Sequence, residues 1–323
     1  MLYPLVFHPI FKDRVWGGRS LERLYAKPLP PAQPIGESWE ICDRPGDASV
    51  IANGPLAGRD LHWLMVYHGA ELLGAARSQQ GRFPLLIKIL DAQDQLSLQV
   101  HPPPRKAAAL GGEPKTEMWY LAAATAAASL YVGLKAGTTR ADFERRLHDG
   151  TVADCFHRVG VRAGDAMFLP SGRVHAIGAG CLIFEIQQNS DTTYRVFDWN
   201  RVGLDGRPRD LHLPESLASI DFDDFEPGLL AGAASDQDGM GRRPLIDDPL
   251  FQVDQLDLPA GPGATLTGNR PVILGVLAGT LNVTAAGTAI QLSPGGFGLI
   301  PASALPARLE SQGATRLLRA VPG

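Results

Sequence analysis

Residues 95–104 read QLSLQVHPPP, a stretch in which polar side chains recur at every second position. Leu96, Leu98 and Val100 alternate with these polar residues, and a period of two is typical of a β-strand. Gln99 and His101 therefore point to the same side of the strand. An amide oxygen and an imidazole nitrogen on one face are a candidate pair of metal ligands. The alternative is that this polar face is solvated.

A second motif places one more histidine near a strand. Residues 164–175 read GDAMFLPSGRVH, in which a Gly-Asp turn starts a strand and a Pro-Ser-Gly turn ends it. His175 then begins the next strand. The pattern GDxxxxPxGxxH resembles the second motif of the cupin superfamily, and this context favours a ligand role for His175. A lone histidine is otherwise more often packed or solvated.

Cupins complete their metal site with a glutamate on a later strand, and Glu117 in KTEMWY matches that place. Gln99, His101, Glu117 and His175 would together offer oxygen, nitrogen, oxygen and nitrogen atoms. This set suits Zn²⁺ in an open catalytic site. Fe²⁺ and Mn²⁺ accept the same donors, so ligand type alone does not choose the metal.

Two cations stand in sequence contexts that need an explanation. Lys88 lies in PLLIKIL, where an ammonium among apolar residues costs free energy unless it is paired or hydrated. It either snorkels from an edge strand or faces a cavity and holds an anion. Arg195 lies in QQNSDTTYRVFDW, and Asp191 is a candidate to orient it. A surface position is an equally simple interpretation of Arg195.

The composition is that of an ordinary globular protein, because 45% of the 323 residues are hydrophobic and 20% are charged. The net charge of −4 gives no reason to expect nucleic acid or a membrane surface as a partner. The N-terminus lacks the features of a signal peptide, and no apolar run reaches the roughly 18 residues of a membrane span. Cys42, Cys155 and Cys181 show no CxxC spacing and predict buried, reduced thiols. We therefore expect a cytoplasmic protein.

Strand-like runs dominate the first two thirds of the chain, and they must position these side chains. They cover residues 37–44, 83–91, 96–102, 116–124, 128–135, 166–171 and 181–188. Apolar spacing of three and four residues predicts helices over 58–77 and 138–150, with a third short helix over 213–220.

Residues 223–245 have little periodicity and predict a linker. Short strands follow it, and residues 295–306 repeat the pattern of residues 164–175 with Pro306 in the place of His175. Chance likeness of two Gly-Pro hairpins is the alternative to a duplication. The sequence thus predicts a mainly β protein of two cupin-like jelly-roll barrels, with a few helices on the N-terminal catalytic part. The predicted domains are residues 1–235, which are catalytic, and residues 236–323, which form a small degenerate cupin-like unit.

Several segments together resemble the class I mannose-6-phosphate isomerases (phosphomannose isomerases) in their short bacterial form. They are GESWEICDRP, FPLLIKILDAQDQLSLQVHP, KTEMWY, GDAMFLPSGRVHAIGAG and EIQQNSDTTYRVFDWNR, with FKDRVWGG near the N-terminus. Apart from FKDRVWGG they fall within residues 36–201. The residues after about 240 resemble the second barrel of the family only loosely.

The resemblance implies reversible isomerisation of a sugar phosphate, mannose 6-phosphate to fructose 6-phosphate, through an enediol. It implies one Zn²⁺ ion per chain, held by the four candidate ligands above. It further implies catalytic roles for Arg195 and Lys115, and substrate-binding roles for Ser97, Lys88, Glu185 and Asp191. Lys115, Lys88 and Glu185 are all candidates for the general base, and Lys115 is the first to test. Pro114 stands where some longer relatives have a histidine, so an acid/base role of that histidine cannot apply here.

Two other functions remain open at this point. An Fe²⁺-dependent cupin oxygenase fits an open metal site, although the lysines and arginine suit a sugar phosphate better than dioxygen. A non-catalytic sugar-phosphate sensor fits the fold, but a sensor is expected to have a degenerate ligand set. The sequence gives no basis for an oligomeric state, and a monomer is plausible.

Overall fold

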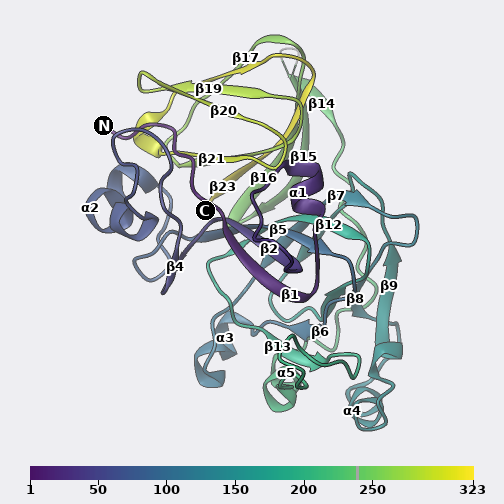
Figure 1. Cartoon of the computed structure of the whole chain (residues 1–323). Helices are drawn as coiled ribbons and strands as arrows, with labels where there is room; N and C mark the ends of the chain where they lie inside the picture. The colour runs from purple at the N-terminus through teal and green to yellow at the C-terminus, as the bar shows by residue number, and fades with distance from the viewer. Residues whose placement is uncertain (238–239) are drawn as a thin grey trace.

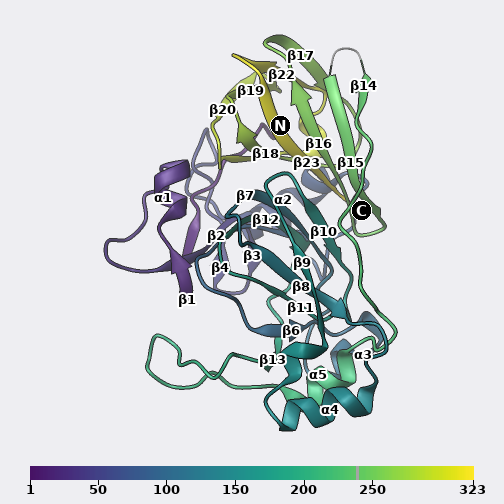
Figure 2. The same cartoon turned by 90° about the vertical axis from the view of Figure 1, so that its right-hand side faces the viewer.

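The computed structural model describes residues 1–237 and 240–323, and its fold is built mainly from β-strands (Figure 1). Two pairs of sheets follow one another along the chain. The second pair lies above the first in both views, and α3, α4 and α5 gather at the far end of the first pair (Figure 2). The prediction of a mainly β protein is confirmed.

The first pair consists of a six-stranded sheet in the order β1-β2-β5-β12-β7-β10 and a five-stranded sheet in the order β13-β6-β11-β8-β9. The strands are β1 Ile10–Gly18, β2 Ile35–Ile41, β5 Leu85–Ala92, β6 Leu98–Val100, β7 Glu117–Ala124, β8 Ser129–Leu134, β9 Phe156–Gly160, β10 Ala166–Leu169, β11 His175–Ile177, β12 Cys181–Gln188 and β13 Tyr194–Phe197. The short strands β3 Asp43–Arg44 and β4 Asp47–Ala48 pair separately. Each strand predicted in this part of the chain is present; the strand over residues 181–188 has the predicted ends, and the others have shifted ends.

Apart from β13, the second pair repeats the strand order of the first, with sheets β14-β15-β16-β23-β18-β21 and β17-β22-β19-β20. Its strands are β14 Ser235–Gln237, β15 Met240–Asp248, β16 Phe251–Leu258, β17 Gly261–Leu266, β18 Val272–Ala278, β19 Leu281–Ala285, β20 Thr288–Leu292, β21 Phe297–Ile300, β22 Ala307–Ser311 and β23 Thr315–Pro322. β10 and β21 begin and end at matching positions of the aligned repeat. This agreement supports a duplication. Among the described residues, each unit is a pair of sheets and not a closed barrel.

The predicted helices over 58–77, 138–150 and 213–220 are present in shortened form. The helices are α1 Ser20–Tyr25, α2 Leu61–Leu73, α3 Pro104–Ala107, α4 Arg140–His148 and α5 Leu213–Ser219, with 3₁₀ turns at Ala108–Leu110, Val152–Cys155 and Ala302–Ala304. Thr139 caps α4 by accepting a hydrogen bond from the amide of Asp142, as a Thr before a helix predicts. No helix among the described residues is long and apolar enough to cross a membrane.

The six-stranded sheet of the first unit is covered on both faces, which explains its long apolar runs. Every residue of β5 and β12 is buried. Phe184 on β12 packs toward the second unit, where its ring lies 5.1 Å from that of Phe297. Because side chains alternate along a strand, Lys88 and Glu185 point to the opposite face. The side chains of Lys88 and Glu185 therefore point into the interior of the first pair of sheets.

The predicted linker over residues 223–245 is wrong in its second half, because β14 and the start of β15 lie in it. Residues 226–234 contain no helix or strand and form the connection. A domain boundary at residue 235 remains a prediction. Cys42, Cys155 and Cys181 are buried and unpaired, as expected.

Candidate active site and metal centre

Strand β6 brings the polar face of QLSLQVH to the inside of the first unit. Ser97 and Gln99 line a cavity, and His101 is buried just after the strand ends. The backbone carbonyl of His101 accepts a hydrogen bond from the amide of Gly172, 2.9 Å away, which ties β6 to the turn before β11. The solvated alternative for this face is therefore wrong.

The Gly-Asp and Pro-Ser-Gly turns position His175 beside Gln99 and His101. Gly164 and Gly172 have φ values of 92° and 102°, in the region that favours glycine, and β10 runs between them. His175 opens β11 and pairs in register with Gln99 of β6. Glu117 opens β7 and pairs with the last residue of β10, so this antiparallel strand pair places Glu117 beside the turn that leads to His175.

His101, Glu117 and His175 form a compact cluster whose ligand atoms lie within 4.8 Å of one another. The Nε2 atom of His175 is 3.2 Å from Oε1 of Glu117, and Nε2 of His101 is 3.6 Å from Oε2. The side-chain amide of Gln99 is 3.2 Å from Nε2 of His175. A half-turn of that amide would present its oxygen to the cluster. The four predicted ligands are thus brought together.

Backbone carbonyls fix the orientation of both imidazole rings. Nδ1 of His101 donates to the carbonyl of Thr192 at 2.8 Å, and Nδ1 of His175 donates to the carbonyl of Arg173 at 2.9 Å. Because a carbonyl only accepts, each Nδ1 carries the proton and each Nε2 keeps its lone pair toward the cluster. This arrangement is typical of metal-ligating histidines.

The residues of the cluster fit a divalent cation. Both carboxylate oxygens of Glu117 are buried and accept no well-aligned hydrogen bond from the described residues, although Nζ of Lys115 lies 2.8 Å from Oε2. Burial opposes ionisation of Glu117, but Lys115 and the two histidines hold its pKa well below the usual range. Burial, reinforced by Lys115, lowers the pKa of His101 to about 3. An ionised carboxylate beside two neutral imidazoles is a donor set for a metal ion.

A row of side chains crosses four strands of the six-stranded sheet in register. It runs from Trp39 on β2 through Lys88 on β5 and Glu185 on β12 to Trp119 on β7. Nζ of Lys88 lies 3.6 Å from carboxylates of both Glu185 and Glu37, and the indole of Trp119 donates to Glu185 at 2.9 Å. Because β5 is an interior strand, Lys88 does not snorkel from an edge; it faces the cavity.

The two carboxylates next to Lys88 have opposite pKa shifts. Burial raises the pKa of Glu185, and the neighbouring cations do not fully offset it. Burial also opposes ionisation of Glu37, but Lys88 and Arg14 outweigh it and lower its pKa to about 2. Of the two carboxylates, Glu185 therefore has the pKa that is closer to neutral pH. A pKa shifted in this direction suits a group that accepts and returns protons.

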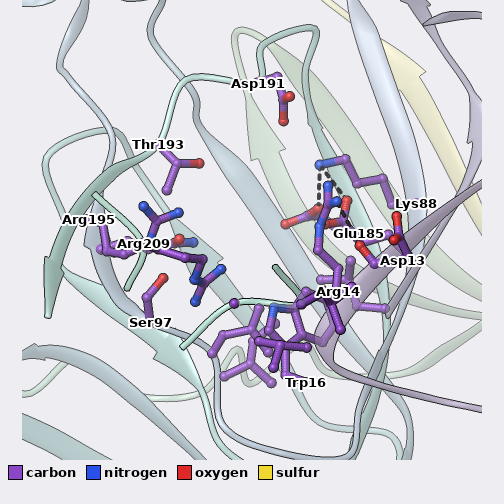
Figure 3. Close-up of a pocket in the computed structure, with 18 of the residues that line it drawn as sticks. Asp13, Arg14, Trp16, Lys88, Ser97, Glu185, Asp191, Thr193, Arg195 and Arg209 are labelled. Atoms are coloured by element: carbon purple, nitrogen blue, oxygen red, sulfur yellow. Dashed lines mark hydrogen bonds and ion pairs between the residues drawn. The ribbon is translucent and has the colours of Figure 1, made fainter. Parts of the chain in front are cut away.

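The cavity between the two sheets has a volume of about 620 Å³. Figure 3 shows Lys88 and Glu185 with Arg14 in one part of it, and Arg195, Arg209 and Ser97 in another. The predicted residues that line it are Ser97, Gln99, Lys88, Lys115, Glu185, Asp191 and Arg195. Side chains predicted from three separate segments of the sequence therefore meet in one cavity.

Asp191 does not orient Arg195, contrary to the hypothesis from their spacing. The guanidinium of Arg195 donates instead to the backbone carbonyl of Asp210 at 2.6 Å. Arg14, Glu37 and Arg209 also line the cavity and were missed. Glu37 could have been found from the alternation of GESWEI, which places it on the face of Trp39. Arg209 lies in the turn-rich stretch GLDGRPRD, where no periodicity predicts a direction.

The sheet pairs and the buried cluster define the class as a cupin-type β protein with a candidate metal centre. Residues 5–128 match the family described as phosphomannose isomerase type I, catalytic domain. Mannose-6-phosphate isomerase ManA of Bacillus subtilis is 40% identical over 223 residues, which are 68% of this chain and 68% of that protein. A mannose-6-phosphate isomerase of Streptococcus mutans is 36% identical over 254 residues, 78% of each chain.

A solved structure agrees with these sequence relatives over the full length. The crystal structure of the mannose 6-phosphate isomerase from Bacillus subtilis has a TM-score of 0.90 at 28% identity and covers 99% of both chains. The chain belongs to the type I phosphomannose isomerases.

Proposed function

We propose that the chain interconverts mannose 6-phosphate and fructose 6-phosphate. The observation that supports this most is one cavity that combines a buried lysine–glutamate pair with three arginines, and whose wall residue Lys115 contacts the His/Glu/His cluster. The names of the relatives support the same reaction. An oxygenase gives no reason for this many cations around a single cavity, and a non-catalytic sensor gives no reason for a complete ligand set.

We propose that Gln99, His101, Glu117 and His175 hold one Zn²⁺ ion per chain. The buried oxygens of Glu117, which accept no well-aligned hydrogen bond from the described residues, and the fixed imidazole rings support this assignment. When bound, the ion supplies a Lewis acid that polarises the oxygen atoms next to the reacting carbons. The donor set suits zinc, and the resemblance to the family implies this metal.

We propose that Glu185 moves the proton between C2 and C1 of the open-chain sugar. The reaction removes a proton from C2 and returns it to C1, while a proton leaves O2 and another reaches O1. The raised pKa of Glu185 and its place on the cavity wall support its role as base. Lys115, the first candidate from the sequence, pairs its ammonium with Glu117 and is better suited to donate a proton at O1 or O2. Lys88 holds Glu185 in place.

The phosphate group of the substrate is assigned to the part of the cavity that contains Arg195 and Arg209. Two guanidinium groups provide the paired donors that phosphate oxygens prefer. Ser97 adds a hydroxyl beside them (Figure 3). Asp191 is assigned to bind a sugar hydroxyl near Lys115 and Arg14. Its negative charge helps to raise the pKa of both of these cations.

Replacing Arg195 by lysine is expected to lower kcat/KM for mannose 6-phosphate by about tenfold to hundredfold, because an ammonium cannot form the bidentate contact. Metal content should stay at the wild-type value. Steady-state kinetics with elemental analysis measure both, and Arg207→Lys, at an exposed position of the loop that follows β13, is the control. If Arg195→Lys had the kinetics of wild type, Arg195 would not bind the substrate and the surface-residue interpretation would be correct.

The proposed function is tested by turnover of mannose 6-phosphate coupled to the formation of glucose 6-phosphate. Turnover supports the isomerase, whereas oxygen uptake with the same protein would favour the oxygenase. Binding of the sugar phosphate without turnover, with zinc restored, would favour the sensor. The cytoplasmic location, the plausible monomer and the absence of nucleic-acid and membrane partners remain predictions.

A further inference from the structure

Asp198 binds two arginines that belong to the loop between β13 and α5. Its carboxylate accepts from Nε and Nη2 of Arg209 at 2.7 and 2.5 Å, and from Nη2 of Arg201 at 2.9 Å. Asp198 is only 5% exposed, so these contacts are made in a partly dry environment. Burial opposes its ionisation, but the two arginines outweigh burial and lower the pKa of Asp198. The carboxylate is therefore a charged anchor for both side chains.

The two arginines differ in what they can reach. Arg209 lines the cavity beside Arg195, whereas Arg201 lies outside the described cavity lining and binds the backbone carbonyl of Gln95. Burial and then the charge of Arg209 lower the pKa of Arg195, so the two guanidinium groups repel each other. Nε of Arg195 is buried and has no hydrogen-bond partner among the described residues. Two cations that line one cavity, one of them with an unpartnered Nε, form a site for a dianion.

The backbone after Asp198 is held in a conformation that is uncommon for its residues. Trp199 and Asn200 have φ values of 58° and 55°, in the left-handed region. The indole of Trp199 donates to the carbonyl of Leu96 at 2.8 Å, next to Ser97, and its ring packs against that of Tyr131. These contacts offset the strain and fix Asp198 relative to β6.

We propose that Asp198 is a positioning residue for recognition of the substrate phosphate, because it holds Arg209 beside Arg195 against their mutual repulsion. Asp198 does not touch the substrate and acts through Arg209. This inference rests on the proposed function, since it assigns the anion to the phosphate of the same sugar. Without Asp198, the side chain of Arg209 has no other ion pair among the described residues to keep it in the cavity.

The test compares Asp198→Asn, Arg209→Gln, the double variant and Arg201→Gln. Asp198→Asn and Arg209→Gln are each expected to raise KM for mannose 6-phosphate about tenfold and change kcat less than about threefold, as loss of uniform binding predicts. Adding Asp198→Asn to Arg209→Gln should raise KM by no more than about twofold, because the two residues act as one unit. Arg201→Gln should leave KM within about twofold of wild type, since Arg201 does not reach the cavity. Far-ultraviolet circular dichroism and thermal unfolding identify variants that fail to fold.

Three results would overturn the proposal. The first is that folded Asp198→Asn has the KM of wild type. The second is that Asp198→Asn raises KM as much in the Arg209→Gln variant as it does in wild type. The third is that Arg201→Gln raises KM as much as Asp198→Asn does. Titration with inorganic phosphate by calorimetry separates this inference from the proposed function. If wild type binds phosphate and Asp198→Asn binds it at least about tenfold more weakly, the anchor is supported even if mannose 6-phosphate is not turned over.

Discussion

The variants His101→Ala and His175→Ala are expected to lose the bound metal ion and nearly all turnover of mannose 6-phosphate. Each removes an imidazole whose Nε2 faces Glu117 and whose Nδ1 is already bound to a backbone carbonyl. We expect a loss of about 10³-fold or more in kcat/KM, because the Lewis acid contributes several kcal/mol. The overall fold should survive, since each change leaves both sheets in place.

Metal content by elemental analysis and turnover by the coupled assay test this prediction together. His148→Ala is the matched control, because the side chain of His148 is 91% exposed and lies on α4. The control should keep wild-type metal content and activity. Unchanged metal content in both His101→Ala and His175→Ala would show that the ligand assignment is wrong.

Replacement of Glu185 by glutamine is expected to lower kcat by about 10² to 10⁴-fold, the usual contribution of a general base. Glutamine keeps the volume and can still accept the hydrogen bond from Trp119. Lys88 retains its contact with Glu37. The variant should therefore fold and keep its metal while losing the group that accepts the C2 proton.

The pH dependence of kcat/KM gives a second measurement of the same role. The base works when ionised, and burial raises the pKa of Glu185 above its ordinary value of 4.5. Activity of the wild type should thus fall as pH drops through a value above 4.5, and this limb should be missing from the residual activity of Glu185→Gln.

Glu40→Gln is the control for loss of a buried, paired carboxylate outside the cavity, because Glu40 binds Lys27 at 2.7 Å. It should lower stability without loss of turnover. A Glu185→Gln variant with near wild-type kcat would exclude Glu185 as the base and return Lys115 to first place.

The metal cluster could be predicted from sequence because its signals are local. Gln99 and His101 share a strand face by simple alternation, and the glycines around β10 fix the turns that deliver His175. Glu117 starts the strand that pairs with β10. The relations of Gln99, His101 and His175 depend on a few consecutive residues, whereas Glu117 was named from the resemblance to cupins, because its pairing joins strands far apart in the sequence.

The cavity wall could not be predicted in the same way, because it depends on register between strands far apart in the sequence. Lys88 meets Glu185 only because β5 pairs with β12 in one alignment, and a shift of one residue would turn them to opposite faces. Arg209 enters the cavity through its ion pair with Asp198, across an irregular loop. No local pattern encodes such a contact.

The misassigned linker has a related cause. β15 contains Gly241 and Pro244, which usually argue against a strand between two neighbours. A register shift next to Pro244 accommodates the missing amide in its pairing with β16. Tertiary pairing therefore overrides the local preference of this segment, and only the residues before it form a connection.

The most direct single measurement is a zinc titration of the metal-stripped wild-type protein, with turnover of mannose 6-phosphate recorded at each addition. We predict that activity is lost with the chelator, returns in proportion to added zinc and saturates at one ion per chain. Turnover that persists in the stripped protein, or that stays absent after one equivalent of zinc is bound, would contradict a metal-dependent isomerase built on His101, Glu117 and His175.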